Sequence, residues 1–231
     1  MLLPKSGTDL LVDESILKNH TETRESYLGF SQIGEECERK LFYGLNIPTA
    51  ISDARILRIF KLGHIMETEI IKLLKDSGLT IYDLDEDGKQ FEAGYFNNKY
   101  RGHPDGIVTG LPESKVPHLL EIKTYNEKRF NTLKKEGVKS SDPKYYAQLI
   151  VNMGAFDLTR ALFVAYNKNT SEMYYERVDY DPFENALLMA KAGRVLDFKT
   201  DEQIDRPYPS KDFFKCKFCD YREHCWGITK E

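Results

Sequence analysis

Two short stretches constrain this chain more than any other part of its sequence: 103–106, which reads H-P-D-G, and 120–123, which reads L-E-I-K. Fifteen residues separate Asp105 from Glu121. The pattern predicts the end of one β-strand and the middle of the next. Because alternate residues of a strand point to the same face, Glu121 and Lys123 share one side of the sheet. With Asp105 closing the preceding strand, the sequence predicts two carboxylates and one amine at a single point.

These residue types suit a divalent cation. Asp105 and Glu121 supply hard oxygen ligands of the kind that Mg2+ and Mn2+ prefer, and a bound ion polarises a phosphate and lowers the pKa of an attacking water. The amine of Lys123 can orient that water or neutralise charge that develops on the phosphate. The alternative is an ordinary strand edge with a solvated Glu and Lys, since E-x-K alone is common. The P-D-G turn and the apolar neighbours Leu120 and Ile122 favour a metal-dependent site that cuts phosphodiesters.

The chain has four cysteines, and three of them follow one another as C-x2-C-x5-C. They are Cys37, Cys216, Cys219 and Cys225. Structural disulfides do not suit a chain without an export signal, whereas four thiolates in a reducing compartment suit one metal or iron-sulfur site. The alternative, four unrelated buried cysteines, does not explain the tight C-terminal spacing. Zn2+ and an iron-sulfur cluster both accept four cysteine ligands, so the spacing leaves the choice between them open.

The composition limits the class of protein. A chain of 231 residues with 41% hydrophobic residues is expected to bury one main core. The net charge of -4 excludes a globally basic nucleic-acid binder, so any contact with nucleic acid must use local patches. No apolar signal region opens the chain, and no window is long and apolar enough to span a membrane. We therefore expect a soluble, cytoplasmic protein with no membrane contact.

The periodicity predicts a mixed α/β order of elements. An apolar face over 54–75, with Ser52 as the N-cap and Ser77-Gly78 as the stop, predicts a long helix. Strands and turns alternate between 79 and 123 and are expected to form a meander that carries the two acidic stretches. The expected strands are 80–84, 90–96, 100–108, 118–124, 160–166 and 172–180. The expected later helices are 127–135, 144–156 and 182–198.

With these residues placed, the chain resembles the PD-(D/E)XK nuclease superfamily, and within it the RecB-like, CRISPR-associated branch that carries an iron-sulfur cluster. The resemblance extends from Cys37 to Cys225, with one cysteine before the core and three after it. It implies an α/β fold with a restriction-endonuclease-like core, a mixed sheet flanked by helices, and N- and C-terminal helical lobes joined by a 4Fe-4S cluster. The expected organisation is a single nuclease domain over 1–231, with a helical N-terminal region over 1–78, a nuclease core over 79–200 and a cysteine segment over 201–231.

The resemblance implies further ligands for the catalytic metal. Gly63-His64 matches a family histidine on the helix before the core, which implies that His64 is a third protein ligand beside Asp105 and Glu121. On sequence alone, a single helical histidine is more often a packing or surface residue. The backbone carbonyl of Ile122 can add one more oxygen ligand.

A glutamine on the helix after E-x-K is another family motif, and Gln148 fits it. The match implies that Gln148 orients groups near Lys123 or the DNA. The family usually has a tyrosine four residues later, where this chain has Asn152. The role of that tyrosine is therefore either lost or taken by Tyr145 or Tyr146.

Basic and aromatic residues interleave around the C-terminal cysteines, a mixture that suits single-stranded nucleic acid. The alternative is that the rings of Phe214, Phe218 and Trp226 only shield the cysteine site. The candidate DNA contacts over the whole chain are Arg39, Tyr145, Lys215, Lys217 and Arg222.

Together these features predict a Mg2+ or Mn2+ dependent DNA exonuclease that acts on single strands or DNA ends. One alternative is a nuclease subunit of a larger machine, for CRISPR acquisition or helicase-coupled recombination. Another is a non-catalytic DNA-binding adaptor with the same fold. The chain has no G-x-x-x-x-G-K-[ST] loop, so a P-loop motor would have to come from a partner. A virus-encoded enzyme and a cellular one would look alike at this level.

Overall fold

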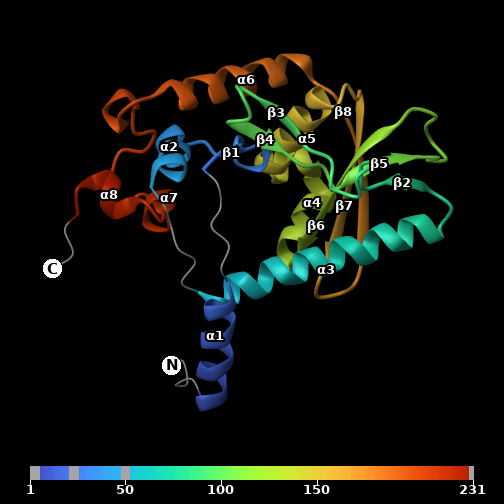
Figure 1. Ribbon diagram of the computed structural model, residues 1–231, viewed down its shortest axis with the longest axis horizontal. Helices are drawn as coiled ribbons and strands as arrows, with labels where there is room; N and C mark the ends of the chain where they lie inside the picture. Colours follow the sequence, from blue (N-terminus) through green and yellow to red (C-terminus); the bar gives the residue numbers. More distant parts are fainter. Residues whose placement is uncertain (1–5, 21–25, 48–52, 229–231) are drawn as a thin grey trace.

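A five-stranded sheet lies at the centre of the fold, which is mixed α/β (Figure 1). The computed structural model describes residues 6–20, 26–47 and 53–228. The strand order is β2-β5-β6-β7-β8, with β6 and β7 parallel and the other neighbours antiparallel. The strands are β2 (Thr80–Tyr82), β5 (Gly106–Thr109), β6 (His118–Tyr125), β7 (Arg160–Asn167) and β8 (Met173–Asp179).

Helices cover both faces of this sheet. Leu120 and Ile122 of β6 pack with the C-terminal half of α3 (Ala54–Asp76), whereas Leu119 and Tyr125 belong to the larger core on the opposite face. The alternation follows from the two-residue period of a strand. The parallel pair β6 and β7 needs a crossover, which α4 (Glu127–Ser141) and α5 (Pro143–Ala155) provide. A further helix, α6 (Pro182–Asp197), packs against α5.

The predicted strand 100–108 is wrong, because the chain divides it between two sheets. Its first segment is β4 (Tyr100–Gly102), which joins β1 (Leu28–Gly29) and β3 (Ala93–Tyr95) in a three-stranded sheet. Its last segment is β5 of the main sheet. Pro104 cannot donate to a strand ladder, and Gly106 has φ +155°, where an added Cβ would lie 2.8 Å from the Tyr82 carbonyl oxygen. The expected single meander is therefore replaced by a break that places Asp105 at the start of β5.

The predicted helix boundaries are mostly confirmed. The long helix ends at Ser77 followed by Gly78 at φ +93°, as expected. Its N-cap is Asp53 instead of Ser52, with the Asp53 side chain accepting the N–H of Arg55 at 2.8 Å; Ser52 lies outside the described residues. The predicted helix 127–135 is longer, because α4 continues to Ser141 across a kink at Gly137.

Segments from the two ends of the chain lie side by side. Phe42 and Tyr43 of α2 (Glu38–Asn46) form a small core with Ile204 and Tyr221. The C-terminal pieces are η2 (Asp201–Gln203), α7 (Phe214–Lys217) and α8 (Arg222–Trp226). Figure 1 shows α2, α7 and α8 next to one another, away from the central sheet.

Two N-terminal elements complete the fold. A short turn, η1 (Phe30–Gln32), packs on α5, and α1 (Gly7–Asn19) contacts α3. None of the helices in the described residues is both long enough and apolar enough to cross a membrane.

Candidate active site

Asp105 is tied directly to the E-I-K strand. Its Oδ2 accepts the backbone N–H of Ile122 at 2.6 Å, and its own N–H donates to the carbonyl oxygen of Leu120 at 3.2 Å. Both Asp105 and Glu121 are buried. The structure therefore brings the two predicted carboxylates together at the point where β5 begins beside β6.

Lys123 and Gln148 converge on the same carboxylate. The Nζ of Lys123 lies 2.5 Å from Glu121 Oε1, and the Nε2 of Gln148 donates to that oxygen at 2.7 Å. Lys123 also lies 5.3 Å from the centroid of the Tyr145 ring. Tyr145 and Tyr146 are the two candidates to replace the tyrosine that Asn152 substitutes. Tyr145 lies beside Lys123, whereas the ring of Tyr146 lies under Lys139.

Two oxygen atoms in this cluster lack a partner. Glu121 Oε2 and Gln148 Oε1 are buried without a hydrogen-bond partner among the described residues. Such orphaned atoms are costly unless a water or an ion satisfies them. Burial raises the pKa of both Asp105 and Glu121, although Lys123 opposes the shift. Burial alone would lower the pKa of Lys123, but Glu121 and Asp105 outweigh it and raise that pKa. Without a bound cation, the buried pair of carboxyls beside one ammonium group is therefore more easily protonated than free carboxyls.

Glu67 on α3 is a site residue that sequence reasoning missed. It lines a cavity of about 540 Å3 together with Asp105. Burial, and then the nearby Asp105, raises the pKa of Glu67 to about 7. The signal in the sequence was its spacing of three residues from His64, which places both on one helix face. The His64 side chain is 82% exposed, with its Nδ1 3.9 Å from Glu67 Oε2.

The pKa of Glu67 predicts how the stability of the metal-free protein depends on pH. A carboxyl whose pKa rises from 4.5 to about 7 on folding keeps a proton that the unfolded chain releases. Glu67 therefore contributes fully to stability below the pKa that it has in the unfolded chain. This contribution is lost as the pH rises to the pKa of about 7 that Glu67 has in the folded protein. Relative to Glu67→Gln, the wild type should lose about 3 kcal/mol of unfolding free energy over that range. Urea melts in EDTA measure this, and a difference between the two proteins that does not vary with pH would contradict it.

The carboxylates of this site suit a magnesium-type ion, although they do not enclose one. Within the described residues, no group of three or more His, Cys, Asp or Glu side chains is arranged so that it could hold a metal ion. Mg2+, however, commonly takes one or two protein carboxylates and completes its shell with water and substrate phosphate. Asp105 and Glu121 provide such a pair, and Glu67 provides a third carboxylate at the edge of the site.

Asn152 lies one helical turn after Gln148 and is fully buried. Both of its side-chain polar atoms lack a hydrogen-bond partner within the part of the chain that the structure describes. The position where the family usually has a tyrosine is therefore occupied by a buried amide that bonds to no polar group of the described chain.

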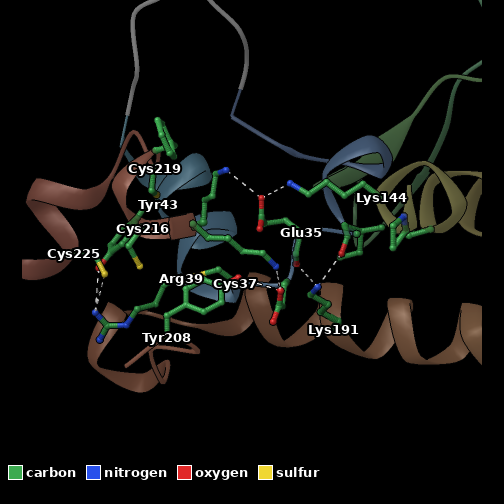
Figure 2. Close-up of a pocket in the computed structure, with 18 of the residues that line it drawn as sticks. Glu35, Cys37, Arg39, Tyr43, Lys144, Lys191, Tyr208, Cys216, Cys219 and Cys225 are labelled. Carbon is green, nitrogen blue, oxygen red and sulfur yellow. Dashed lines mark hydrogen bonds and ion pairs between the residues drawn. The ribbon is translucent and has the colours of Figure 1, made fainter. Parts of the chain in front are cut away.

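The four cysteines line one cavity of about 720 Å3 between α2, α5, α6 and the C-terminal segment (Figure 2). All four are free thiols and half-buried. Burial raises the pKa of Cys37 and of Cys219, while the backbone N–H groups of Lys40 and Tyr221 favour their thiolates. The four cysteines thus share one cavity, but among the described residues no three of them form a group that could hold a metal ion.

Arg39, a predicted DNA contact, is engaged by other parts of its own chain. Its guanidinium is buried and donates from Nε to the carbonyl oxygen of Ile204 at 2.6 Å and from Nη2 to that of Asp201 at 2.5 Å. Its Nη1 lies 3.2 Å from Asp201 Oδ2 and 3.8 Å from Cys225 Sγ. Arg39 therefore joins α2 to the C-terminal segment and presents no group to a phosphate.

Substituting Arg39 should affect stability and leave DNA affinity unchanged. Arg39→Lys keeps the charge but cannot supply the forked set of donors, so we expect the unfolding free energy to fall by about 2 kcal/mol. The exposed Lys217→Ala should leave stability within error and weaken DNA binding. Chemical denaturation and filter binding, done on both variants, separate the two roles, and the reverse pattern would restore Arg39 as a DNA contact.

The predicted DNA contacts on the C-terminal segment differ in whether their charged group already has a partner in the chain. Lys215 pairs with Glu36, and Arg222 donates to Asp212 Oδ1 at 3.2 Å and to a backbone carbonyl. Lys217 is exposed. The rings of Phe214 and Phe218 line the cysteine cavity and are also largely exposed. Their position is compatible with both proposed roles, shielding and stacking.

No protein-family model matches this sequence, and no curated protein does so either. Solved structures do match. An alkaline exonuclease from Laribacter hongkongensis, LHK-Exo, has a TM-score of 0.54 at 16% identity, covering 79% of this chain and 90% of that one. The structure of the same enzyme in complex with dAMP has a TM-score of 0.54 at 16% identity, and the match covers 74% of this chain and 87% of that one. The structure of SSO0001 has a TM-score of 0.54 at 14% identity, and the match covers 97% of this chain and 98% of that one. The chain thus shares the fold of these solved structures.

Proposed function

We propose that this protein is a Mg2+ or Mn2+ dependent DNA nuclease, an exonuclease that acts on single strands or DNA ends. The buried group formed by Asp105, Glu121 and Lys123 carries this proposal, because two carboxylates and one amine meet there and one oxygen of Glu121 has no partner among the described residues. The fold shared with an alkaline exonuclease supports it. A structure of that enzyme holds dAMP, a deoxynucleoside monophosphate of the kind that cleavage at an end would release.

In this proposal Asp105 and Glu121 hold the ion, and Glu67, His64 and the carbonyl oxygen of Ile122 are further candidate ligands. The ion would supply Lewis-acid activation of water and phosphate. Lys123 stays protonated, because its two carboxylate neighbours raise its pKa, and it therefore neutralises charge that develops on the phosphate.

Gln148 acts through Glu121 in the same mechanism. Its amide nitrogen holds Glu121 Oε1, which leaves Oε2 for the ion. Its own Oε1 is buried without a partner among the described residues and, in this proposal, would accept a hydrogen bond from the attacking water. Both roles require the side chain to stay in its present rotamer, and the surrounding α5 residues are buried.

We further propose that the four cysteines hold a 4Fe-4S cluster, as in the RecB-like, CRISPR-associated branch. The number and type of the donors support this proposal, because four thiols line one cavity and backbone N–H groups face two of the sulfurs. In the described residues the thiols do not yet form a group that could hold a metal, so binding would have to draw them together. Such a cluster would link α2 to α7 and α8 and hold the two ends of the chain together. Metal analysis and an absorption spectrum of anaerobically purified protein decide between iron and zinc, since a zinc protein is colourless.

A set of end-labelled DNA substrates tests the function. Linear single strands, linear duplexes and circular single strands would be incubated with Mg2+ or Mn2+, with EDTA as the control. The proposal expects metal-dependent release of mononucleotides from linear DNA and intact circles. Cleavage of circles would replace the exonuclease by an endonuclease, and no cleavage of any substrate would favour an adaptor or a subunit that needs a helicase or CRISPR partner.

A further inference from the structure

Four buried polar atoms on β6 and α5 have no hydrogen-bond partner within the described part of the chain. They are Glu121 Oε2, Gln148 Oε1 and both amide atoms of Asn152, Oδ1 and Nδ2. Asn152 is fully buried, and its neighbours Val151 and Met153 belong to the larger apolar core. A buried amide without a partner costs free energy that a hydrocarbon side chain at the same place would avoid. Packing therefore does not explain why this position carries an amide.

Asn152 and Gln148 stand four residues apart on α5 and so lie on one face of it. At this spacing the two Cβ atoms are about 5 to 6 Å apart, and pairs of amide side chains can hydrogen-bond. Their unpartnered atoms are complementary, because Gln148 Oε1 accepts hydrogen bonds and Asn152 Nδ2 donates them. A turn of the Asn152 side chain, or one water between the two amides, would satisfy both atoms.

Such a bond would complete the support of Glu121. The Nε2 of Gln148 donates to Glu121 Oε1 at 2.7 Å, and Lys123 Nζ lies 2.5 Å from the same oxygen. Gln148 is thus held at one end of its amide, and a bond from Asn152 to Oε1 would hold the other end. With both ends held, Gln148 keeps Glu121 in the orientation that leaves Oε2 for an ion.

We propose that Asn152 is a positioning residue of the metal site: it donates from Nδ2 to Gln148 Oε1 and thereby keeps Gln148 on Glu121. The inference rests on the proposed function and deepens it, because Asn152 touches neither the ion nor DNA and acts through two other side chains. Groups that orient a metal ligand matter for the metal, and their removal typically weakens metal binding or activity by about 10 to 100-fold.

Mn2+ binding in the absence of DNA tests this role, because it reports on Glu121 and does not depend on cleavage. Electron paramagnetic resonance of free Mn2+, in titrations of the full chain, gives the affinity. Asn152→Leu keeps the branching of the side chain and removes its donor, so we expect Mn2+ to bind about tenfold more weakly or worse. Asn152→Ala is a smaller apolar variant that should give the same result if Leu cannot be accommodated. Urea melts in EDTA show which variants are folded.

Two further variants separate positioning from a general effect of packing. Asn185→Leu on α6 is the matched control, because Asn185 also has an unpartnered amide oxygen and packs on α5, where its Nδ2 would lie 2.8 Å from a Cβ built on Gly154. It should bind Mn2+ like the wild type. Gln148→Met keeps the length of the side chain without its amide. Because Asn152 acts through Gln148, adding Asn152→Leu to Gln148→Met should weaken binding no further.

A folded Asn152→Leu or Asn152→Ala protein with wild-type Mn2+ affinity overturns the inference. An effect of Asn152→Leu that persists undiminished on top of Gln148→Met also overturns it, and so does an equal loss in Asn185→Leu. Glu121→Ala separates this inference from the proposed function, since it should abolish the Mn2+ site. If it does and Asn152→Leu binds like the wild type, only the role of Asn152 is wrong. If Glu121→Ala binds Mn2+ like the wild type, the proposed metal site and this inference fail together.

Discussion

Lys123→Ala is expected to reduce metal-dependent DNA cleavage by about a thousandfold or more. The substitution removes the only amine within bonding distance of Glu121 that the described residues show, and with it the charge that would balance a developing phosphate anion. It also removes the cation that offsets the burial of two carboxylates. Single-turnover cleavage of labelled single strands at saturating Mn2+ measures the loss.

The control for this prediction is Lys134→Ala. Lys134 is an exposed lysine on α4 that pairs with Glu172, so its removal changes the net charge equally without touching the site. It should cleave at close to the wild-type rate. Because Lys123→Ala leaves buried carboxylates unbalanced, circular dichroism must accompany the assay. A folded Lys123→Ala protein with undiminished cleavage would reject the assigned site.

Cys216→Ala is expected to remove the group bound by the cysteines and to destabilise the C-terminal segment. A bound metal or cluster that joins both ends of a chain contributes its binding energy to folding. We expect the visible absorbance to disappear and the melting temperature to fall by about 10 °C or more. Absorption spectra and thermal melts of anaerobically prepared protein measure both effects.

The neighbouring substitution Lys217→Ala is the matched control, because it changes an exposed residue one position along and spares every thiol. It should keep the absorbance and the melting temperature. The contacts of Arg39 with Asp201 and Ile204 do not depend on a metal, so residues 201–204 should stay attached to α2 in Cys216→Ala. A variant that keeps its colour and melts like the wild type would exclude Cys216 as a ligand.

The local pattern of the sequence was enough to place the central chemistry. The two-residue period of β6 sets Glu121 and Lys123 on one face, and Pro104 followed by Gly106 forces the turn that carries Asp105. The resemblance to a nuclease superfamily pointed to Gln148, and the packing of α5 on β6 brings it to Glu121. These relations need only short stretches of chain and the fixed geometry of strands and helices.

Long-range contacts decided the rest. No local signal distinguishes Glu67 from the exposed His64 three residues before it, because both fit the same helix face, and only the packing of α3 on the sheet turns Glu67 toward Asp105. Arg39 is buried only because the segment around Asp201 returns to α2 from the far end of the chain. By itself the sequence determined that Asp105, Glu121 and Lys123 lie close together, since that depends on local strand periodicity and on one turn. The tertiary structure alone decided that Glu67 and Gln148 lie beside these residues, since that depends on how distant helices pack on the sheet.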